Sequence, residues 1–512
     1  MMNRPRRIVV VSNRLPVVLS RRDDGGWSAR PGSGGLVTAL TPVLRRCNGL
    51  WIGWPGIAGE PDLRVEEVIR EAGSKMGMML SPIELTGEEV SGFYHGFSNE
   101  ILWPLFHDLV AGDHFDGRYW SVYQQVNAKV ARLVARLAEP SDFIWIQDYH
   151  FLTAAVGLRC LGVSNPLGFF LHTPFPAPDM FLRLPWREQI LGALLEFDLI
   201  GFQCPRDRRN FIECVEALRA AEVEETRRSI TLLRVPKRRR RAHEDSTSCV
   251  RVGSFPISID YESFNTLALS ERVRRVAARL ANQIGRGLRV LLGVDRLDYT
   301  KGLPHKIRAF ARSLECYPEL REKITLVQHV VPSRECLPQY RALRLEIEQL
   351  VGEVNGKYGT RGWVPVRYFY HTLEREDLAA FYRLADVLLV TSLKDGMNLV
   401  SKEYCASCVD GNGVLVLSEF AGSSTELGPG ALLVNPYDSD GLARAIRDAV
   451  LMSGAVRRRR MMALRTTVRE RDVFQWVDRY LEAAESPEAE VTPAFESLVP
   501  GGSAVRSAWP TA

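Results

Sequence analysis

Short apolar runs and longer amphipathic stretches alternate along the chain. Continuous apolar runs at 8–11, 143–146 and 290–292 have the character of strands that are buried on both faces. Between such runs, apolar residues recur every three or four positions, as in the helix predicted from 122 to 137. This alternation predicts an α/β fold built from doubly wound parallel sheets, and no short sequence repeat indicates a solenoid.

One interruption of the alternation divides the chain. A polar, basic stretch ends near Pro256, and the strand and helix pattern then begins again. Because 512 residues exceed the size at which one hydrophobic core stops growing, we expect two domains, 1–255 and 256–485. The last helix of the second domain either stays there or packs back on the first. The remainder, 486–512, is rich in Pro, Ser and Gly and is predicted to be a disordered tail.

Composition narrows the class of partner. A net charge of +5, with 25% charged residues, is too small a basic excess to indicate nucleic acid. The basic runs at 237–241 and 457–460 are predicted to be solvated. No apolar run could span a bilayer and the first residues do not resemble a signal peptide, so we expect a cytoplasmic protein without a membrane partner. Nine scattered cysteines fit a reducing compartment, and the lone pair Cys405 and Cys408 is predicted to pack in a helix.

The stretch 287–306 carries the clearest candidate chemistry. An apolar strand ends in a charged turn that contains Arg296, Asp298 and Lys301, and a helix begins near Leu303. Open α/β sheets bind their ligands at the carboxyl ends of their strands. The donor fork of Arg and the compact charge of Lys suit the two phosphates of a nucleotide diphosphate. Charged residues at strand ends are also ordinary solvated loop residues, so this stretch alone leaves both interpretations open.

Two glycine turns before helices offer further anion sites. Gly34 and Gly35 stand at the entrance of an apolar-periodic helix, where free backbone amides can approach a phosphate. Asp395 lies in a second such turn, and Glu403 in the following helix could accept hydrogen bonds from ribose hydroxyls. A glycine turn is also common as plain punctuation.

Polar residues also follow two apolar strands of the first half. Asp148 and His150 follow one strand, and His172 follows the next. Polar clusters at neighbouring strand ends converge as an active site requires, although His150 alone is interpreted as a satisfied structural histidine. The segment 93–108 is crowded with aromatic residues and lacks a clean helical period, so it either fills a core or stacks on a sugar ring.

Together these segments resemble the trehalose-6-phosphate synthases, a family of retaining glycosyltransferases. The resemblance extends from about residue 8 to about residue 481 and rests on eight strings in the family's order: VVVSNRLP, SGGLVTAL, FSNEILWPLFH, IWIQDYH, GFFLHTPFP, DRLDYTKG, NGKYGTRGWVPV and DGMNLVSKEY. It implies two Rossmann-like domains that face each other across a cleft, the GT-B type of fold. It also implies transfer of glucose from UDP-glucose to glucose 6-phosphate, which gives trehalose 6-phosphate and UDP.

The resemblance assigns a set of residues to the sugar-nucleotide donor. Arg296 and Lys301 would hold the diphosphate, Glu403 would bind the ribose, and Asp395 would bind the donor sugar. The complete donor set that it implies is Gly34, Gly35, Arg296, Lys301, Asp395, Leu399, Val400 and Glu403.

A second set is implied for the acceptor. Arg14, Tyr94 and Arg334 would bind its phosphate and Asp148 its hydroxyls, while Trp103 and His172 match positions that shape the sugar pocket. The residues that the resemblance implies for catalysis are Arg296, Lys301, Asp148 and His172.

The same resemblance implies a reaction on one face of the donor, in which the leaving phosphate takes the proton of the acceptor. Catalysis would then come from positioning and from cations that stabilise the departing UDP. No Asp-x-Asp motif stands near these residues, so we expect neither a metal nor another cofactor. No phosphatase-like segment follows Leu481, so a synthase acting alone is expected.

Three alternatives stay open. One is a glucosylglycerol-phosphate synthase, and another is a relative that uses a different nucleotide-glucose. The third is a catalytically idle subunit that binds sugar phosphates, because a fold does not guarantee an activity. A homo-oligomer is also compatible with the sequence.

Overall fold

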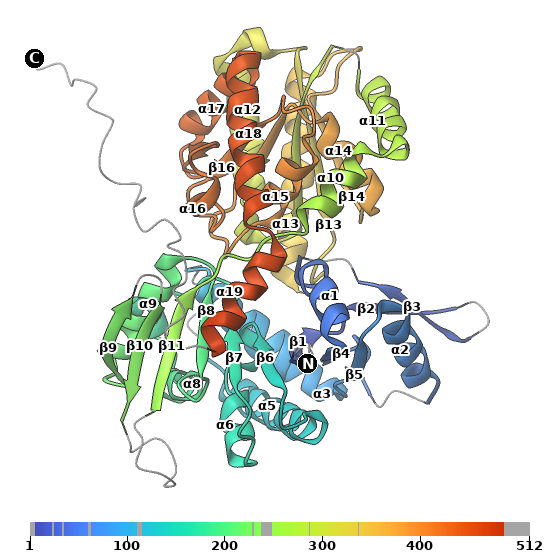
Figure 1. The fold of residues 1–512 in the computed structure, drawn as a ribbon. Helices are drawn as coiled ribbons and strands as arrows, with labels where there is room; N and C mark the ends of the chain where they lie inside the picture. The colour runs from blue at the N-terminus through green and yellow to red at the C-terminus, as the bar shows by residue number, and fades with distance from the viewer. Residues whose placement is uncertain are drawn as a thin grey trace, which may run out of the picture.

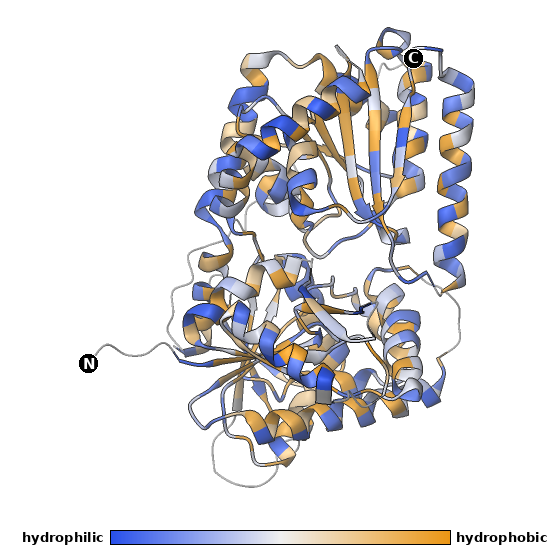
Figure 2. Ribbon diagram, turned by 90° about the vertical axis from the view of Figure 1, so that its right-hand side faces the viewer, coloured by the Kyte–Doolittle hydropathy of each residue, from blue (hydrophilic) through white to orange (hydrophobic). Residues whose placement is uncertain are grey.

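The computed structural model describes residues 6–22, 25–32, 35–59, 63–109, 115–227, 230–236, 248–285, 287–335 and 337–485. These residues form two lobes, each built around one large sheet (Figure 1). The predicted tail at 486–512 and the basic run at 237–241 lie outside the described residues. In both lobes the strands are largely apolar and the helices around them carry the polar residues outward (Figure 2).

Nine strands form the sheet of the first lobe within the described residues, in the order β5-β4-β1-β6-β7-β8-β11-β10-β9. From β5 to β11 neighbouring strands run parallel, and the order turns back between β1 and β6. Such a reversal is the switch point at which doubly wound sheets bind ligands. The strands are β1 Ile8–Arg14, β4 Leu50–Trp54, β5 Met79–Pro82, β6 Phe143–Gln147, β7 Leu167–Phe170, β8 Leu199–Phe202, β9 Glu222–Arg227, β10 Ile230–Val235 and β11 Ser248–Ser254.

The sequence suggested that the polar stretch before Pro256 interrupts the pattern of strands and helices. The structure shows that part of this stretch belongs to the sheet. It forms β9 and β10, which extend the sheet as antiparallel strands beside β11. Along β10, buried residues alternate with less buried ones. Half-exposed antiparallel strands of this kind show alternation instead of an apolar run. The first sheet is therefore mixed and not wholly parallel.

Helices cover both faces of this sheet. They are α1 Gly35–Cys47, α2 Leu63–Met76, α3 Gly87–Glu89, α4 Trp103–Phe106, α5 Gly117–Leu137, α6 Ala154–Cys160, α7 Pro178–Phe181, α8 Arg187–Leu194 and α9 Pro205–Ala217, with a short 3-10 turn at Tyr149–Phe151 and a small hairpin of β2 Val17–Arg21 and β3 Trp27–Pro31. The aromatic segment after residue 90 is a π-helix, Val90–Leu102. Its hydrogen bonds span five residues, which explains why the sequence lacks the 3.6-residue period of an α-helix.

The second lobe has the order β14-β13-β12-β15-β16-β17 with every neighbouring pair parallel. Counted along the chain this order is 3-2-1-4-5-6, as in dinucleotide-binding folds. Its strands are β12 Arg289–Arg296, β13 Ile324–Val331, β14 Val366–Tyr370, β15 Val387–Val390, β16 Val414–Ser418 and β17 Leu432–Val434. Its helices are α10 Tyr261–Leu269, α11 Glu271–Ile284, α12 Leu303–Cys316, α13 Pro338–Tyr358, α14 Arg375–Leu384, α15 Leu399–Ser407, α16 Ser424–Leu427, α17 Ser439–Leu451 and α18 Gly454–Glu470. The predicted pair of doubly wound domains is confirmed, apart from the antiparallel extension.

The last helix, α19 (Val473–Glu485), crosses to the first lobe and packs on its sheet (Figure 1). Tyr480 stacks on Trp145 with ring centroids 4.4 Å apart, and its hydroxyl donates to the carbonyl of Phe169 at 2.9 Å. Gly168 and Gly201 make room for this ring, because a Cβ on either would lie 2.7 Å from a Tyr480 atom. In three dimensions the helix belongs to the first lobe.

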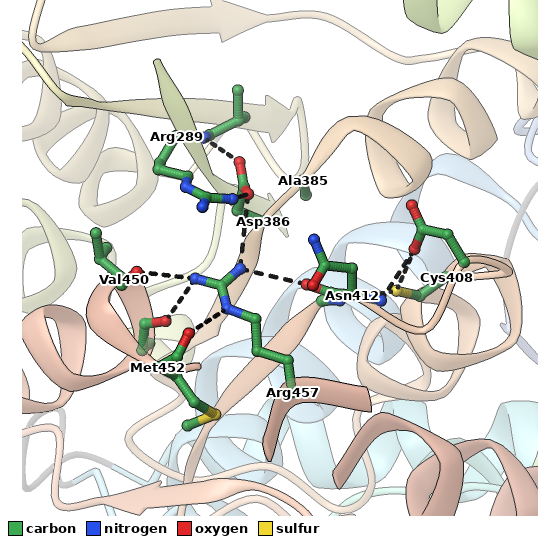
Figure 3. A network of polar contacts seen from close by, with 12 residues as sticks. Arg289, Ala385, Asp386, Cys408, Asn412, Val450, Met452 and Arg457 are labelled. Atoms are coloured by element: carbon green, nitrogen blue, oxygen red, sulfur yellow. Dashed lines mark hydrogen bonds and ion pairs between the residues drawn. The ribbon is translucent and has the colours of Figure 1, made fainter. Parts of the chain in front are cut away.

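One residue of the run 457–460 corrects the prediction that the run is solvated. Arg457, on α18, is only 2% exposed. Its guanidinium donates to the carbonyls of Ala449, Val450 and Met452 at 2.9 to 3.1 Å, and it lies 3.6 Å from the carboxylate of Asp386 (Figure 3). Its neighbours Arg458 and Arg459 are exposed as expected. In a helix, successive side chains point in different directions, so one residue of such a run can face the core. The composition of the run does not identify that residue.

Two smaller findings concern partners and cysteines. None of the helices that the structure describes is both long and apolar enough to cross a membrane. Cys405 and Cys408 are buried free thiols at the end of α15, as predicted.

Candidate active site

The predicted site residues gather where the strands of both sheets end. Arg14 is the last residue of β1, and Asp148 and His172 follow β6 and β7. In the second lobe Arg296 is the last residue of β12, and Arg334 and Asp395 follow β13 and β15. Both groups therefore lie at or beside the switch points of their sheets. Contacts between the lobes, described below, bring the two groups together.

Lys301 and Asp395 form the centre of the donor side. The Lys301 ammonium donates to Asp395 Oδ2 at 2.6 Å, and both side chains are mostly buried. Burial alone would raise the pKa of Asp395, but the charge of Lys301 and hydrogen bonds from Lys301 and Asn398 hold it below its usual value. Gly302, at φ 63°, follows directly, and a Cβ there would overlap the carbonyl oxygen of Thr391. The donor loop is therefore packed tightly onto the end of β15.

The start of α15 presents the other donor residues. Asn398 holds a strained backbone at φ 93° and caps the helix by accepting from the Ser401 amide at 3.0 Å. Glu403 accepts from the Tyr382 hydroxyl at 2.8 Å, and burial raises the pKa of its carboxyl group. Leu399 and Val400 lie in the first turn of the helix.

The first helix of the other lobe meets this turn. A Cβ on Gly35 would overlap the end of the Leu399 side chain, so the starts of α1 and α15 lie against each other. Gly34, its predicted companion, lies outside the described residues. The structure thus brings Gly35 of the first lobe against Leu399 of the second, beside the turn that carries Asp395, which pairs with Lys301.

Arg14 and Tyr94 form one edge of the acceptor side. Arg14 is exposed, and its guanidinium carbon lies 4.5 Å from the centre of the Trp54 ring. Tyr94, from the π-helix, lies 5.6 Å from the same ring. An arginine that stacks on an aromatic face keeps its hydrogen-bond donors available for an anion.

Arg334 reaches from the second lobe to the first. Its guanidinium donates to the hydroxyl of Tyr340 at 2.7 Å in its own lobe and to that of Tyr149 at 3.3 Å in the other. Its Cζ lies 4.0 Å from the ring centre of Trp103. The backbone of Arg334 is left-handed, at φ 49°. A non-glycine residue held in this region is typical of functional sites.

Asp148 and His172 lie between the donor and acceptor sides. Asp148, itself at φ 69°, accepts the backbone amide of His172 at 3.1 Å. Burial raises the pKa of Asp148 to about 6. On the far side, a Cβ on Gly396 would overlap the His172 carbonyl oxygen, so the turn before α15 touches this backbone directly.

The His172 ring has both nitrogens engaged. Nε2 lies 2.8 Å from Gln147 Oε1, and Gln203 Nε2 lies 3.1 Å from Nδ1. Gln203 Oε1 accepts the Ile257 amide at 2.9 Å, which orients its amide so that Nε2 donates to His172. The ring is therefore neutral with its proton on Nε2, and burial lowers its pKa to about 3. Both ring nitrogens of His172 are therefore engaged by Gln147 and Gln203.

Sequence reasoning missed Tyr149, Gln147 and Gln203. Tyr149 stands beside Asp148 in IWIQDYH but looked like an ordinary core aromatic residue. The two glutamines are polar residues at or just beyond the ends of apolar strands, where a buried amide needs a partner, and this could have marked them.

His150 corrects a second interpretation. It is buried, as expected of a structural histidine, but neither ring nitrogen has a hydrogen-bond partner in the part of the chain that the structure describes. Its ring lies among aromatic rings, 4.1 Å from that of Tyr149 and stacked on that of Tyr94. Burial, together with the charges of Arg334 and Arg14, lowers its pKa to about 3 and keeps it neutral.

The comparisons with known proteins agree with this geometry. The model of glycosyltransferase family 20 matches residues 6–486. A trehalose-6-phosphate synthase of Mycobacterium sp. strain JLS is 41% identical over 477 residues, which are 93% of this chain and 95% of that protein. The corresponding protein of Mycobacterium tuberculosis strain H37Rv is 40% identical over 480 residues, 93% of this chain and 94% of its own length.

Solved structures extend this likeness to three dimensions. A trehalose-6-phosphate protein from E. coli bound with UDP-2-fluoro glucose has a TM-score of 0.81 at 34% identity, over 93% of this chain and 98% of that one. A UDP-forming α,α-trehalose-phosphate synthase from Burkholderia xenovorans, in complex with glucose-6-phosphate, has a TM-score of 0.80 at 32% identity, over 94% of this chain and 100% of that one. The chain belongs to glycosyltransferase family 20.

Proposed function

We propose that the protein transfers glucose from UDP-glucose to glucose 6-phosphate and forms α,α-trehalose 6-phosphate and UDP. The observation that carries this proposal is the presence of two pairs of cations at the strand ends of the two sheets, near Asp148 and Asp298. Arg296 and Lys301 form one set, and Arg14 and Arg334 form the other. A donor diphosphate and an acceptor phosphate each need cations of their own.

On the donor side, the two cations meet the charge that develops on the leaving group. Arg296 is exposed at the end of β12, and Lys301 is held beside it by Asp395. As the bond between the sugar C1 and the phosphate oxygen breaks, negative charge grows on UDP, and preorganised cations stabilise that charge. Glu403, at α15, is proposed to bind the ribose, with Leu399 and Val400 beside the nucleotide.

On the acceptor side, Arg14 and Arg334 are proposed to fix the phosphate with Tyr94, while Asp148 accepts from a sugar hydroxyl. The acceptor oxygen then forms its bond to C1 of the donor on the face from which UDP leaves. The acceptor proton passes to the departing phosphate oxygen, so no protein base is required. Positioning of two bound reactants supplies much of the rate enhancement in such a reaction.

The engagement of Asp395 supports a route without a covalent intermediate. Its Oδ2 is occupied by Lys301, Ser392 and Asn398, at 2.6, 3.2 and 3.3 Å. Against the effect of burial, the charge of Lys301 and the hydrogen bonds from Lys301 and Asn398 hold the pKa of Asp395 below its usual value. A carboxylate whose negative charge is stabilised in this way is a weak nucleophile.

The decisive experiment is an assay of purified protein with UDP-glucose and either glucose 6-phosphate or glycerol 3-phosphate. We expect trehalose 6-phosphate from the first acceptor and little product from the second. Replacing UDP-glucose by ADP-glucose or GDP-glucose in parallel tests the donor. Absence of trehalose 6-phosphate would refute the proposal, and absence of any turnover would favour the idle sugar-phosphate-binding subunit.

Independence of metal is part of the proposal. Among the described residues, no three His, Cys, Asp or Glu side chains are grouped as metal ligands. We expect unchanged kcat after dialysis against a chelator, and a loss that Mg²⁺ or Mn²⁺ restores would contradict this part. A cytoplasmic location and a homo-oligomeric state stay predictions of the sequence.

A further inference from the structure

We propose that Asp298 is a positioning residue that holds Arg334 in place for the acceptor phosphate and thereby joins the donor loop to the acceptor site. The inference rests on the proposed function, because it assigns Arg334 to the acceptor. Asp298 lies in the donor loop between Arg296 and Lys301 but has no assigned ligand of its own.

The geometry gives the Asp298 carboxylate two partners in two loops. Its side chain is 1% exposed. Oδ1 accepts the Thr300 amide at 3.0 Å and so fixes the turn that carries Lys301. Oδ2 lies 3.5 Å from Nη1 of Arg334, which follows the neighbouring strand β13. One buried side chain therefore connects the loops after β12 and β13.

The electrostatics explain why an acidic residue is needed there. Burial alone would raise the pKa of Asp298, but the charges of Arg334, Arg296 and Lys301 lower it below its usual value. The two donor-side cations, Arg296 and Lys301, and the acceptor-side cation Arg334 thus all interact with the buried carboxylate of Asp298. A negative charge so close to both sites repels both phosphates, so it cannot assist binding by its charge alone. Its favourable effect must come from orienting the cations.

Arg334 is the cation that depends most on such help. Tyr340 and Asp298 contact Nη1 from its own lobe, and Tyr149 contacts Nη2 from the other. The two phenol hydroxyls are neutral. Among the described residues, Asp298 is therefore the acidic side chain with which Arg334 forms an ion pair. Without it, a mostly buried guanidinium would lose its counter-ion, which is costly, and would reorient.

The test is the variant Asp298→Asn, which keeps an oxygen for the Thr300 amide and removes the charge that faces Arg334. We expect KM for glucose 6-phosphate to rise about tenfold, as for the loss of a charge-assisted contact, while kcat and KM for UDP-glucose change less than about threefold. Unchanged KM for glucose 6-phosphate, or an equal loss for both substrates, would overturn the proposal.

A double-mutant cycle separates positioning from general damage. In an Arg334→Ala background, Asp298→Asn should cause no further rise in KM for glucose 6-phosphate, because the side chain that it positions is gone. Additive effects of the two changes would refute the coupling. If the Asn variant does not fold, Asp298→Ser repeats the test, since a serine hydroxyl can also accept the Thr300 amide.

The matched control is Asp386→Asn. Asp386 also pairs with arginines in the second lobe, at 2.5 Å from Arg289 and 3.6 Å from Arg457, but it lies at the opposite ends of the strands. This control should leave both KM values unchanged. Isothermal titration of glucose 6-phosphate into wild type and Asp298→Asn measures acceptor affinity without turnover. A wild type that binds glucose 6-phosphate but makes no trehalose 6-phosphate would refute the proposed function while still testing Asp298.

Discussion

Two arginines of the second lobe have largely buried side chains but opposite characters, and they lie at the two ends of its sheet. Arg457 lies at the amino ends of the strands and donates to four backbone carbonyls, among them that of Asn412 at 3.3 Å (Figure 3). Arg334 lies at the carboxyl ends and contacts phenol hydroxyls, the ring of Trp103 and the shared carboxylate of Asp298.

The difference lies in the partners and not in the burial. Backbone carbonyls are fixed by the fold, so Arg457 is a permanent link between α17, α18 and the loop before β16. Hydroxyls and an aromatic face hold a guanidinium in place and can share it with an anion. A buried arginine is therefore better interpreted from what accepts its hydrogen bonds than from how buried it is.

The largest expected effect tests the structural arginine. Arg457→Leu should lower the free energy of unfolding by about 3 kcal/mol or more, because it leaves buried backbone carbonyls without their donor. Urea denaturation measures this loss, and KM values of the remaining folded protein should not change. Arg458→Leu, at the exposed neighbouring position, should change stability by less than about 0.5 kcal/mol. Equal losses of stability in Arg457→Leu and Arg458→Leu would contradict the structural role assigned to Arg457.

Next in size is the loss of the leaving-group cation. Lys301→Ala should lower kcat about a hundredfold or more, as for other removed charge stabilisers, and should also lower the unfolding midpoint, because the buried Asp395 loses its counter-ion. Single-turnover kinetics with saturating UDP-glucose provide the measurement. Lys357→Ala serves as control, since Lys357 is exposed and pairs with the exposed Glu315. Normal turnover of the Lys301 variant would contradict its assigned role.

The dependence on pH tests the site between the two cation sets. With its pKa raised to about 6, Asp148 binds a proton in the folded protein at pH values where the unfolded chain has lost it. Its contribution to stability therefore falls as the pH rises from about 4 to about 6. For activity the sign is opposite, because only the carboxylate accepts from the acceptor hydroxyl, so kcat/KM should fall below pH 6.

The acceptor phosphate also gains a proton near pH 6. Below that pH, the logarithm of kcat/KM should fall with a slope of about two for wild type and about one for Asp148→Asn. Identical slopes would show that Asp148 does not titrate in the productive complex.

The smallest expected effect concerns the hydrogen bond between the lobes, which Arg334 donates to the Tyr149 hydroxyl. Tyr149→Phe removes the long hydrogen bond from Arg334, together with the one that the hydroxyl donates to Asn99 at 3.1 Å, and should raise KM for glucose 6-phosphate about threefold to fivefold, with kcat unchanged. Tyr123→Phe is a poor substitute, since that hydroxyl donates to the Tyr149 backbone. Tyr437→Phe, at an exposed position, is the better control. If Tyr149→Phe raised KM for glucose 6-phosphate more than Asp298→Asn does, the hydrogen bond from Arg334 to Tyr149 would contribute more to acceptor binding than the ion pair with Asp298.

Much of the fold could be predicted because buried parallel strands have continuous apolar runs in their sequences, such as the run in the strand that ends at Arg296. β10 was missed because its burial alternates, and the π-helix because its period is not that of an α-helix. Residues at strand ends, such as Asp148, could be found from the pattern alone. The roles of Asp298 and Arg457 could not, because they depend on which side chain across the fold accepts or donates to them.

Helix α19 has a consequence for the order of synthesis. Residues at the far end of the described chain supply Trp476 and Tyr480 to a core whose strands begin at Ile8. Domains generally fold as units while the chain is being made, starting from the amino terminus. Here the surface around Gly168 and Gly201 stays uncovered until the last helix leaves the ribosome, so the first lobe is completed only after the second has been translated.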